Sequence, residues 1–412
     1  TIRDMVKSWY IQMPIEYCDF IANFSDGFVR LARLAANYVV ENPSSSVFDL
    51  LNKPDISGLL NGMLGDDDRD GLYVVAAMKR VGWSEDKQEE GKIISEHLGL
   101  DWAQVKISVE KFHRRFDIAP QGGRFRYISP APLGNYLAAE AWRIFPDEMR
   151  SLQEVLPNEE TNTAYYDRIK EIASYPNVQG QAIDELRFFF QNNNFVNEFT
   201  VRRWSALSAA DPSLASEVLV EFLRESTLQE RNEINYQARR YMVWGLVELA
   251  WYSDAFEHAM ICLALLAEAE NESWANNATE EFKNKFQIYL SGTVVPYIQR
   301  LSILDELIRF DNLTLTKLVI EALSKAGKRD VMRNGGEQLY GLPPQEEWKP
   351  ESTEENITCI SLAVEKLISL TENLSDNLRD TFITSAHEFS SMLPYSHLRE
   401  ILKPYFESIN KA

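Results

Sequence analysis

One group of side chains in this sequence that could do chemistry is basic and lies between residues 111 and 126. It comprises Lys111, Arg114, Arg115, Arg124 and Arg126. Such residues on a helix and the hairpin after it could contact the phosphates of a DNA duplex. Residues 66–130 carry 11 basic and 12 acidic side chains, however, so this segment has no net positive charge to hold a polyanion. A DNA-binding regulator is one function that the sequence leaves open, and its binding would be weak.

Motifs that would make the chain an enzyme are missing from the sequence. No GxxxxGK[ST] phosphate loop, HExxH zinc motif, GxSxG nucleophile turn or cysteine pair at zinc spacing occurs in the 412 residues. The five histidines are scattered, without a partner at metal-ligand or catalytic spacing. We therefore predict no catalytic residue, no metal site and no cofactor bound by this chain itself.

Residues 66–145 must position the basic side chains, and their pattern predicts a winged helix with a small β-hairpin. Residues 71–81 and 89–98 are two segments of helical length and pattern. Asp101 is a predicted N-cap of a third helix, with Gln104 completing an arrangement like a capping box.

The third predicted helix has an apolar face and a basic face. The residues expected to face the core are Ala103, Ile107, Phe112 and Phe116. Lys111, Arg114 and Arg115 fall off that face. Strands are predicted at 116–119 and 124–128, around a Gln121-Gly122-Gly123 turn.

The composition limits the class of protein to which this chain can belong. The net charge is −20, and residues 131–412 hold most of the excess, with 26 basic and 43 acidic side chains, which disfavours nucleic acid as their partner. The three cysteines have no paired spacing and indicate a reducing compartment. Neither a signal peptide nor a membrane-length apolar run is present. We expect a cytoplasmic protein, without a membrane partner, excised from something longer.

Residues 21–38 read IANFSDGFVRLARLAANY, which is typical of a serine or aspartate cap and a glycine followed by an apolar helix. The string also resembles the helical lid of STAND-class P-loop ATPases, the class that includes NACHT-type and bacterial antiviral members. Their lid carries a glycine, any residue, proline signature close to the nucleotide, and Gly27, Phe28 and Val29 stand at that position, with Val29 in place of the proline. The resemblance makes residues 1–65 a lid-like segment and Gly27, Phe28 and Val29 nucleotide-proximal in the parent protein.

The resemblance continues after the wing, at residues 127–142. Immune-receptor members of the class carry a His-Asp pair there, which residues 127–133 (YISPAPL) lack, so their ADP-latch mechanism does not carry over. The continuation from Pro130 to Trp142 is similar to large uncharacterised bacterial ATPases.

Residues 146–412 are predicted to form an α-helical repeat domain. Apolar residues recur at helical spacing in segments of ten to eighteen, with breaks near residues such as Pro157, Pro176, Pro212 and Pro394. Helix pairs of this length are typical of an α-solenoid of tetratricopeptide or HEAT type. Its aromatic residues are expected in the core, and they include Phe188, Phe189, Phe190, Trp204, Trp244 and Trp251.

Two stretches of the array, residues 268–290 and 335–350, also resemble segments of those large bacterial ATPases. The second is rich in glycine and proline and is predicted to be a loop. Tyr340 and Trp348 in this loop are the predicted partner-binding residues, because loops on rigid scaffolds often carry function and Tyr and Trp often anchor interfaces. A packed connection held by Leu339, Tyr340 and Trp348 is the alternative.

The expected fold is therefore all-α: a helical lid remnant, a winged helix, then an α-solenoid. The expected function is the regulatory and partner-sensing region of a STAND-type ATPase, and the resemblance implies a role in bacterial antiphage defence. The helical repeats would bind a protein trigger, and the winged helix would relay that event to an ATPase core outside this chain. The resemblance assigns ATP, magnesium and self-oligomerisation to the parent protein. A winged-helix DNA-binding regulator and a helical-repeat scaffold are the alternatives. A phosphate loop encoded upstream of Thr1 would separate the ATPase hypothesis from both of them.

Overall fold

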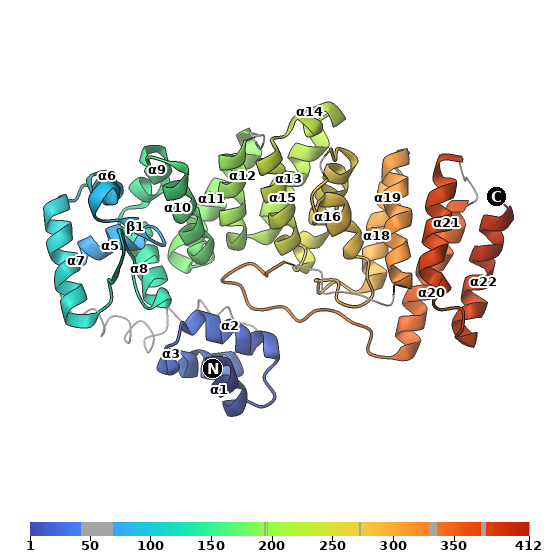
Figure 1. The fold of residues 1–412 in the computed structure, drawn as a ribbon, viewed down its shortest axis with the longest axis horizontal. Helices are drawn as coiled ribbons and strands as arrows, with labels where there is room; N and C mark the ends of the chain where they lie inside the picture. The colour runs from blue at the N-terminus through green and yellow to red at the C-terminus, as the bar shows by residue number, and fades with distance from the viewer. Residues whose placement is uncertain are drawn as a thin grey trace. The chain divides into compact units, whose positions relative to one another are not determined.

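The structure, a computed structural model, describes residues 1–42, 69–192, 195, 197–271, 273–328, 336–371 and 376–411. These residues are mostly helical, with 21 α-helices, many of them packed in pairs, and one small antiparallel sheet of three strands (Figure 1). The predicted helical class is thereby confirmed. The predicted boundary at residue 65 lies outside the described residues.

The chain divides into two compact units. Unit 1 comprises Thr1–Leu186, Ala206–Asp211 and Leu339–Pro344. Unit 2 comprises Arg187–Ser205, Pro212–Gln338 and Gln345–Ala412. Each unit therefore draws residues from separate stretches of the sequence.

Unit 1 begins with three helices that pack on one another, α1 (Ile2–Trp9), α2 (Ile15–Ser25) and α3 (Val29–Glu41). The sequence of residues 21–38 suggested a serine or aspartate cap for the apolar helix that it contains, which is α3. That expectation is wrong, because Phe28 is the N-cap and provides no side-chain hydrogen bond. Ser25 instead donates to the Ile21 carbonyl within α2, at 2.6 Å.

The middle of unit 1 contains α5 (Asp70–Ala76), α6 (Gln88–His97) and α7 (Trp102–Phe116), with a short 3₁₀ helix, η2 (Glu85–Lys87), before α6. The three helices pack on one another. Their sheet consists of β1 (Val81–Gly82), β2 (Gln121–Gly122) and β3 (Phe125–Arg126), with β3 in the centre. Both pairings are antiparallel and place Arg126 opposite Val81 on one side and Gln121 on the other.

Two predicted boundaries here are wrong. Helix α5 ends at Ala76 rather than at residue 81, because Val81 pairs with β3, a partner that local sequence cannot reveal. The first wing strand lies at residues 121–122 rather than 116–119. Residue 116 still belongs to α7, which ends where Asp117 adopts a left-handed conformation with φ of 54°.

The N-cap of α7 is confirmed, since Asp101 accepts a hydrogen bond from the Gln104 amide at 2.9 Å. The predicted apolar face of this helix is wrong in part, because Phe112 is buried, as predicted, while two of the other three residues are exposed. Ala103 and Ile107 are exposed, and the side chain of Phe116 is not among those that the structure describes. The buried face is formed by Val105, Val109 and Phe112, since these residues share the side that packs on α5 and α6.

Four further helices complete the helical part that follows the sheet: α8 (Ala131–Ile144), α9 (Pro146–Val155), α10 (Glu159–Ile172) and α11 (Pro176–Asn192). Helix α8 packs on α5, α9 and α10, and α9 also packs on α6. An Asn158–Thr161 capping box begins α10, directly after the break predicted at Pro157. Pro176 is the first residue of α11, as a proline in the first turn of a helix allows.

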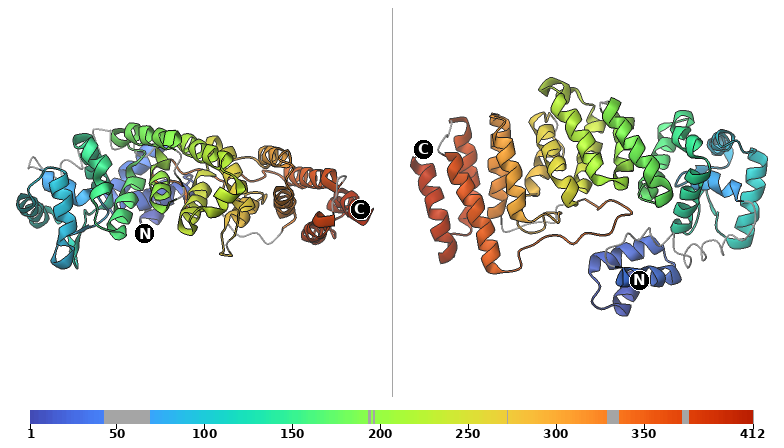
Figure 2. Two further views of the ribbon diagram at one scale, coloured as in Figure 1. Left: turned by 90° about the horizontal axis from the view of Figure 1, so that it is seen from above. Right: turned by 180° about the vertical axis from the view of Figure 1, so that it is seen from behind.

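Unit 2 is built from the following helices in chain order: α12 (Glu198–Leu207), α13 (Pro212–Glu225), α14 (Leu228–Glu233), α15 (Tyr236–Leu249), α16 (Ser253–Glu268), α17 (Ala278–Asn284), α18 (Tyr297–Ile308), α19 (Leu313–Ser324), α20 (Thr353–Thr371), α21 (Asp376–Ser390) and α22 (Ser396–Lys411). Short 3₁₀ turns follow α12 and α19: η3 (Ser208–Ala210), which belongs to unit 1, and η4 (Lys325–Gly327). The three C-terminal helices lie side by side, in red in both further views (Figure 2).

Helix α16 forms the centre of the first half of unit 2. It packs on α13, α15, α17 and α18, and it is apolar around most of its circumference, as a helix covered by neighbours must be. No helix among the described residues is both long enough and apolar enough to span a membrane.

Candidate functional site

The predicted nucleotide-proximal residues form the turn between α2 and α3. Gly27 has a φ of +87°, a conformation that favours glycine, and Phe28 and Val29 are exposed. Asp26, next to the turn, accepts a hydrogen bond from the backbone N–H of Ala131, the first residue of α8, at 3.0 Å. The turn is thus exposed and is held at its base by α8.

Among the five predicted basic residues, three are engaged in ion pairs within unit 1. Arg124 makes two hydrogen bonds to the Asp86 carboxylate, at 2.7 and 2.8 Å. Arg114 donates to Glu110 at 3.0 Å, and Arg126 donates to the other Glu110 oxygen at 2.6 Å. Arg126, and then Arg114, hold the pKa of the Glu110 carboxyl below its usual value.

Arg126 was predicted to contact nucleic acid at the surface, but its side chain is buried inside unit 1. Its side chain is only 7% exposed, it donates to the Ala119 carbonyl at 2.8 Å, and its guanidinium lies 5.2 Å from the ring centroid of Trp83. The pairing of β3 with β1 and β2 places the Arg126 side chain on the buried side of the sheet. A strand of two residues is too short for its sequence pattern to show which side chain is buried. Lys111 and Arg115 are exposed on α7 and have interactions of their own.

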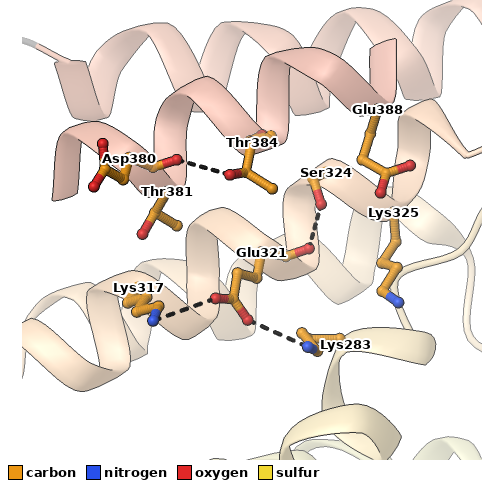
Figure 3. Close-up of a pocket in the computed structure, with 10 residues that line it drawn as sticks. Lys283, Lys317, Glu321, Ser324, Lys325, Asp380, Thr381, Thr384 and Glu388 are labelled. Carbon is orange, nitrogen blue, oxygen red and sulfur yellow. Dashed lines mark hydrogen bonds and ion pairs between the residues drawn. The ribbon is translucent and has the colours of Figure 1, made fainter. Parts of the chain in front are cut away.

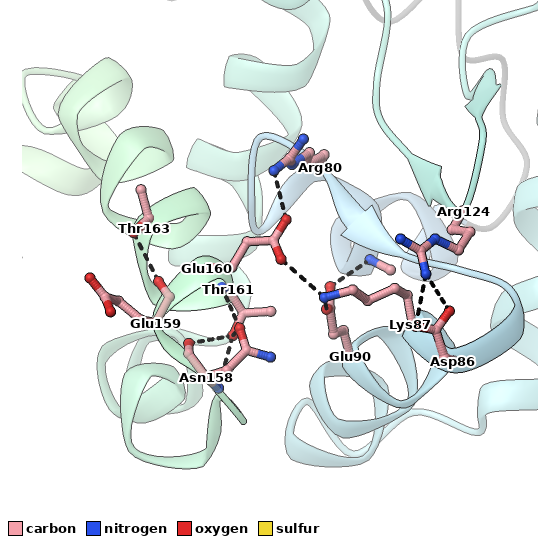
Figure 4. Close-up of polar contacts among 11 residues, drawn as sticks. Arg80, Asp86, Lys87, Glu90, Arg124, Asn158, Glu159, Glu160, Thr161 and Thr163 are labelled. Atoms are coloured by element: carbon pink, nitrogen blue, oxygen red, sulfur yellow. Dashed lines mark hydrogen bonds and ion pairs between the residues drawn. The ribbon is translucent and has the colours of Figure 1, made fainter.

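A network of ions joins the sheet region to the start of α10 (Figure 4). Glu160 bridges two cations, since it accepts from Arg80 at 2.8 Å and from Lys87 at 3.0 Å. Lys87 also pairs with Glu90 at 3.3 Å, and Glu90 accepts a hydrogen bond from the Gly82 amide at 3.0 Å. The hydrogen bond from Lys87 is the main cause that lowers the pKa of Glu160.

Tyr340, a predicted partner-binding residue, is largely enclosed within unit 1. Burial raises the pKa of its hydroxyl above the ordinary value, and the nearby charge of Glu171 adds to the shift. The adjacent Gly341 is buried, with φ of 93°, and its carbonyl accepts a hydrogen bond from Ser174 at 3.3 Å. The loop tip is therefore packed rather than free.

The surroundings of Tyr340 form a buried polar cluster centred on Arg168. The Arg168 side chain is 4% exposed and donates to Asn135, to Glu171 at 2.9 Å and to the Met78 carbonyl at 3.3 Å. Lys79 pairs with the second oxygen of Glu171 at 2.8 Å. Burial lowers the pKa of the Arg168 guanidinium, and Glu171 opposes that shift.

Trp348, the other predicted partner-binding residue, is only partly exposed. Its backbone N–H donates to the Thr293 carbonyl at 2.9 Å, and its ring lies 5.2 Å from the Arg300 guanidinium. The neighbouring Glu347 accepts a hydrogen bond from the Gly292 amide at 2.5 Å. Residues 336–350 have no helix or strand, as predicted, while Gly335 is outside the description. These contacts support the alternative of a packed connection.

Two fully buried cations lie at the two ends of the loop between α17 and α18: Lys285 at the end of α17 and Arg300 in the first turn of α18. Lys285 donates to the Gly292 carbonyl at 2.9 Å, and Arg300 donates to the carbonyls of Lys285, Gln287 and Val295 at 2.9, 2.9 and 2.7 Å. Burial lowers the pKa of Lys285 to about 8 and that of Arg300 to about 10. The two cations act as internal hydrogen-bond donors that give an irregular buried loop its shape.

A polar cavity of about 390 Å³ lies between α17, α19 and α21 (Figure 3). On one wall, Lys283 pairs with Glu280 at 2.5 Å and with Glu321 at 3.2 Å, and Lys325 lies 3.6 Å from Glu280. On the α21 wall are Asp380, Thr381, Thr384 and Glu388. The three lysines of the cavity are paired with carboxylates of described residues, so the cavity offers no unpaired lysine that would select an anionic ligand.

Unit 2 presents an aromatic and basic surface on α15 that the sequence analysis missed. Tyr236, Arg240 and Trp244 follow one another at four-residue spacing, so they share the helix face away from α16. Tyr236 is 43% exposed and Trp244 is 41% exposed. Trp274 packs edge-on against Tyr236 at 6.3 Å and Tyr241 packs edge-on against Trp244 at 5.5 Å. We call these five residues the α15 surface.

Trp244 was expected in the core, and that expectation is wrong, as it also is for Phe188, which is 61% exposed. Phe189, Trp204 and Trp251 are buried, as expected. The sequence pattern on the opposite face of α15 could have shown that Trp244 is exposed. Its buried residues Ala238, Met242 and Leu246 have the same four-residue spacing and leave Trp244 on the outer side.

Exposed aromatic residues with an arginine are the composition that dominates binding energy at protein interfaces. No group of His, Cys, Asp and Glu residues within the described ranges could hold a metal ion. Comparison of the chain with protein-family models, characterised proteins and solved structures finds no significant match. The geometry of the α15 surface is therefore the basis for assigning a function.

Proposed function

We propose that this chain is the regulatory and partner-sensing region of a STAND-type ATPase, and that its helical repeats bind a protein trigger. The α15 surface is the observation that carries the proposal. It holds two tryptophans, two tyrosines and an arginine, with Trp244 and Tyr236 about two-fifths exposed. Residues of these types supply most hot spots in protein interfaces, whereas single exposed apolar residues elsewhere need no such explanation.

In this proposal the helices of unit 2 form an α-solenoid, whose stacked pairs can transmit a change of shape along their length. The helices α5, α6 and α7 with their sheet form a winged helix that relays the change. The element order α5, β1, α6, α7, β2, β3 supports that interpretation, as does the pairing of β1 with β3. The ion network around Glu160 joins the sheet region to α10, and within unit 1 it is a connection through which the change could pass.

A first test concerns the parent protein. We expect a GxxxxGK[ST] motif in the reading frame upstream of Thr1, and no binding of ATP with magnesium by the present chain in calorimetry. An upstream frame without a phosphate loop would favour a helical-repeat scaffold. A micromolar ATP site in the present chain would contradict the assignment of nucleotide binding to another part.

The second test concerns the trigger. A photo-crosslinking amino acid at position 237 of the full-length protein, an exposed position on α15 beside Tyr236, should capture one partner protein, whose addition then raises the ATPase rate. Trp244→Ala should abolish the rise, while Phe310→Ala, which removes an isolated ring that is 46% exposed in the same unit, should leave it unchanged. Equal stimulation of both variants would remove the α15 surface from the proposal.

A further inference from the structure

Arg240 is held between two indole rings on the α15 surface. Its guanidinium carbon lies 4.4 Å from the ring centroid of Trp244 and 6.0 Å from that of Trp274. An arginine stacked on aromatic rings keeps its planar group in one orientation and loses little freedom when it binds. The rings therefore preorganise the guanidinium.

The guanidinium of Arg240 has no carboxylate within 4.0 Å and no hydrogen bond anywhere in the described part of the chain. Of its nitrogens only Nε is buried, so the terminal nitrogens face solvent. Arg202, on α12, gives the contrast, with a side chain that is 9% exposed. It lies 5.0 Å from the Tyr241 ring centroid, but it is already paired with Glu198 at 3.5 Å.

A guanidinium with its faces covered binds through its edge, and its two parallel N–H donors match the two oxygens of a carboxylate. We propose that Arg240 binds a carboxylate side chain of the protein trigger, while Trp244 packs against an apolar residue beside that carboxylate. This inference rests on the proposed function and names the chemistry of the partner.

The charge of the chain further limits the chemical class of the partner segment. Residues 131–412 have 26 basic and 43 acidic side chains, so the surrounding field repels a polyanion. A single acidic residue among apolar ones can pair with Arg240 while its uncharged neighbours are not repelled by the surrounding acidic side chains. The partner segment is therefore an apolar peptide with one acidic residue, rather than a polyacidic tail or a nucleic acid.

The experiment uses two probes, acetyl-Leu-Glu-Phe-amide and acetyl-Leu-Gln-Phe-amide, titrated into the whole chain. Binding is followed through the indole ¹⁵N–H signals of Trp244 and Trp274, assigned with Trp→Phe variants. The dissociation constant of the Glu peptide should be at least about tenfold lower than that of the Gln peptide, because a charge-assisted bidentate pair is lost in the amide. Arg240→Gln should remove the difference, and Arg240→Lys should reduce it.

Arg202→Gln is the matched control, since it removes a stacked arginine that already has a partner, and it should leave the preference for Glu unchanged. Circular dichroism and thermal unfolding show which variants keep the fold. Equal affinity for both peptides, or the absence of binding up to about 10 mM, overturns the proposal. Tighter binding of a phosphoserine peptide or of an oligothymidine overturns the choice of a carboxylate.

The failure of this inference is distinguishable from failure of the proposed function. If Arg240→Gln retains the trigger in the full-length protein while Trp244→Ala loses it, the sensing surface stands and the carboxylate assignment falls. If both variants retain the trigger and respond to it, the α15 surface is not the sensing surface.

Discussion

A buried lysine without an ion pair costs free energy when it is charged, and Lys285 is such a residue. Its pKa is lowered from 10.5 to about 8 by burial. The unfolded chain therefore binds more protons than the folded chain between these pH values, and linkage requires stability to rise with pH across that window. Its Gly292 hydrogen bond offsets part of the cost at lower pH.

We predict that Lys285→Met removes this pH dependence. Relative to the variant, the wild-type chain should gain up to roughly 3 kcal/mol in free energy of unfolding as pH rises from 8 to 10.5. Denaturant titrations at four pH values measure it. Lys317→Met, at a lysine that is more than half exposed, is the control and should follow the wild type. A parallel profile for Lys285→Met would show that the lysine is not buried in solution.

Gly82 and Gly180 make a matched pair of glycine predictions. A Cβ at Gly82 would lie 2.2 Å from the Lys87 carbonyl oxygen and 2.6 Å from Glu90, whereas one at Gly180 meets nothing within 4 Å. Gly82→Ala should destabilise the chain by more than about 2 kcal/mol. Gly180→Ala lies within α11 and should stabilise it by about 0.5–1 kcal/mol. Thermal unfolding that ranks them in the opposite order would contradict the close packing of β1 on α6.

At the scale of elements, the sequence predicts best where the determinant is local. The Asp101 cap depends on a residue three positions away, and the start of α11 depends on Pro176 itself, so both were predictable. Val81 is a strand only because Phe125 and Arg126 pair with this segment, and no local pattern contains that information. Trp244 was misassigned because an aromatic residue on a helix is usually core, while its exposure depends on which neighbours the helix meets.

The Glu160 network should couple the sheet to α10 weakly. Glu160→Gln removes the charge that joins Arg80 and Lys87, so amide exchange in β1, β2 and β3 should quicken by about two- to fivefold, as expected for exposed ion pairs. The difference should shrink at high salt because the charges are screened. Glu154→Gln, at an exposed position on α9, is the control. An effect that is unchanged by salt would indicate a steric rather than an electrostatic role.

The connection that contains Trp348 should be a structural tie. Trp348→Ala exposes the buried Arg300 and should destabilise unit 2 by about 2 kcal/mol or more. Lys349→Ala, at the exposed neighbour, should change stability by less than about 0.5 kcal/mol. Chemical denaturation measures both. Equal, small effects would return Trp348 to the role of a surface anchor, as the sequence first predicted.

For the whole molecule, charge predicts weak binding of DNA. Lys111, Arg114 and Arg115 lie on α7, but the net charge of −20 opposes a polyanion at distance. Fluorescence anisotropy with a random duplex should give a dissociation constant above about 10 µM at physiological salt. Alanine at the three positions should reduce what binding remains, and Arg126 is left intact because its removal would disturb the sheet. Submicromolar binding that the triple variant abolishes would favour the regulator.

Unit 1 includes Leu339–Pro344, which follow more than a hundred residues of unit 2 in the chain. At its base this loop is closed by Gln338, whose side chain exchanges two hydrogen bonds with the backbone of Gln345 at 2.7 and 2.9 Å. On the ribosome, domains usually fold as their sequences emerge, the N-terminal one first. Here the Arg168 cluster is incomplete until Tyr340 has been translated, so unit 1 cannot be completed before more than a hundred residues of unit 2 have emerged, and a nascent chain stalled before residue 339 holds an unfinished interior.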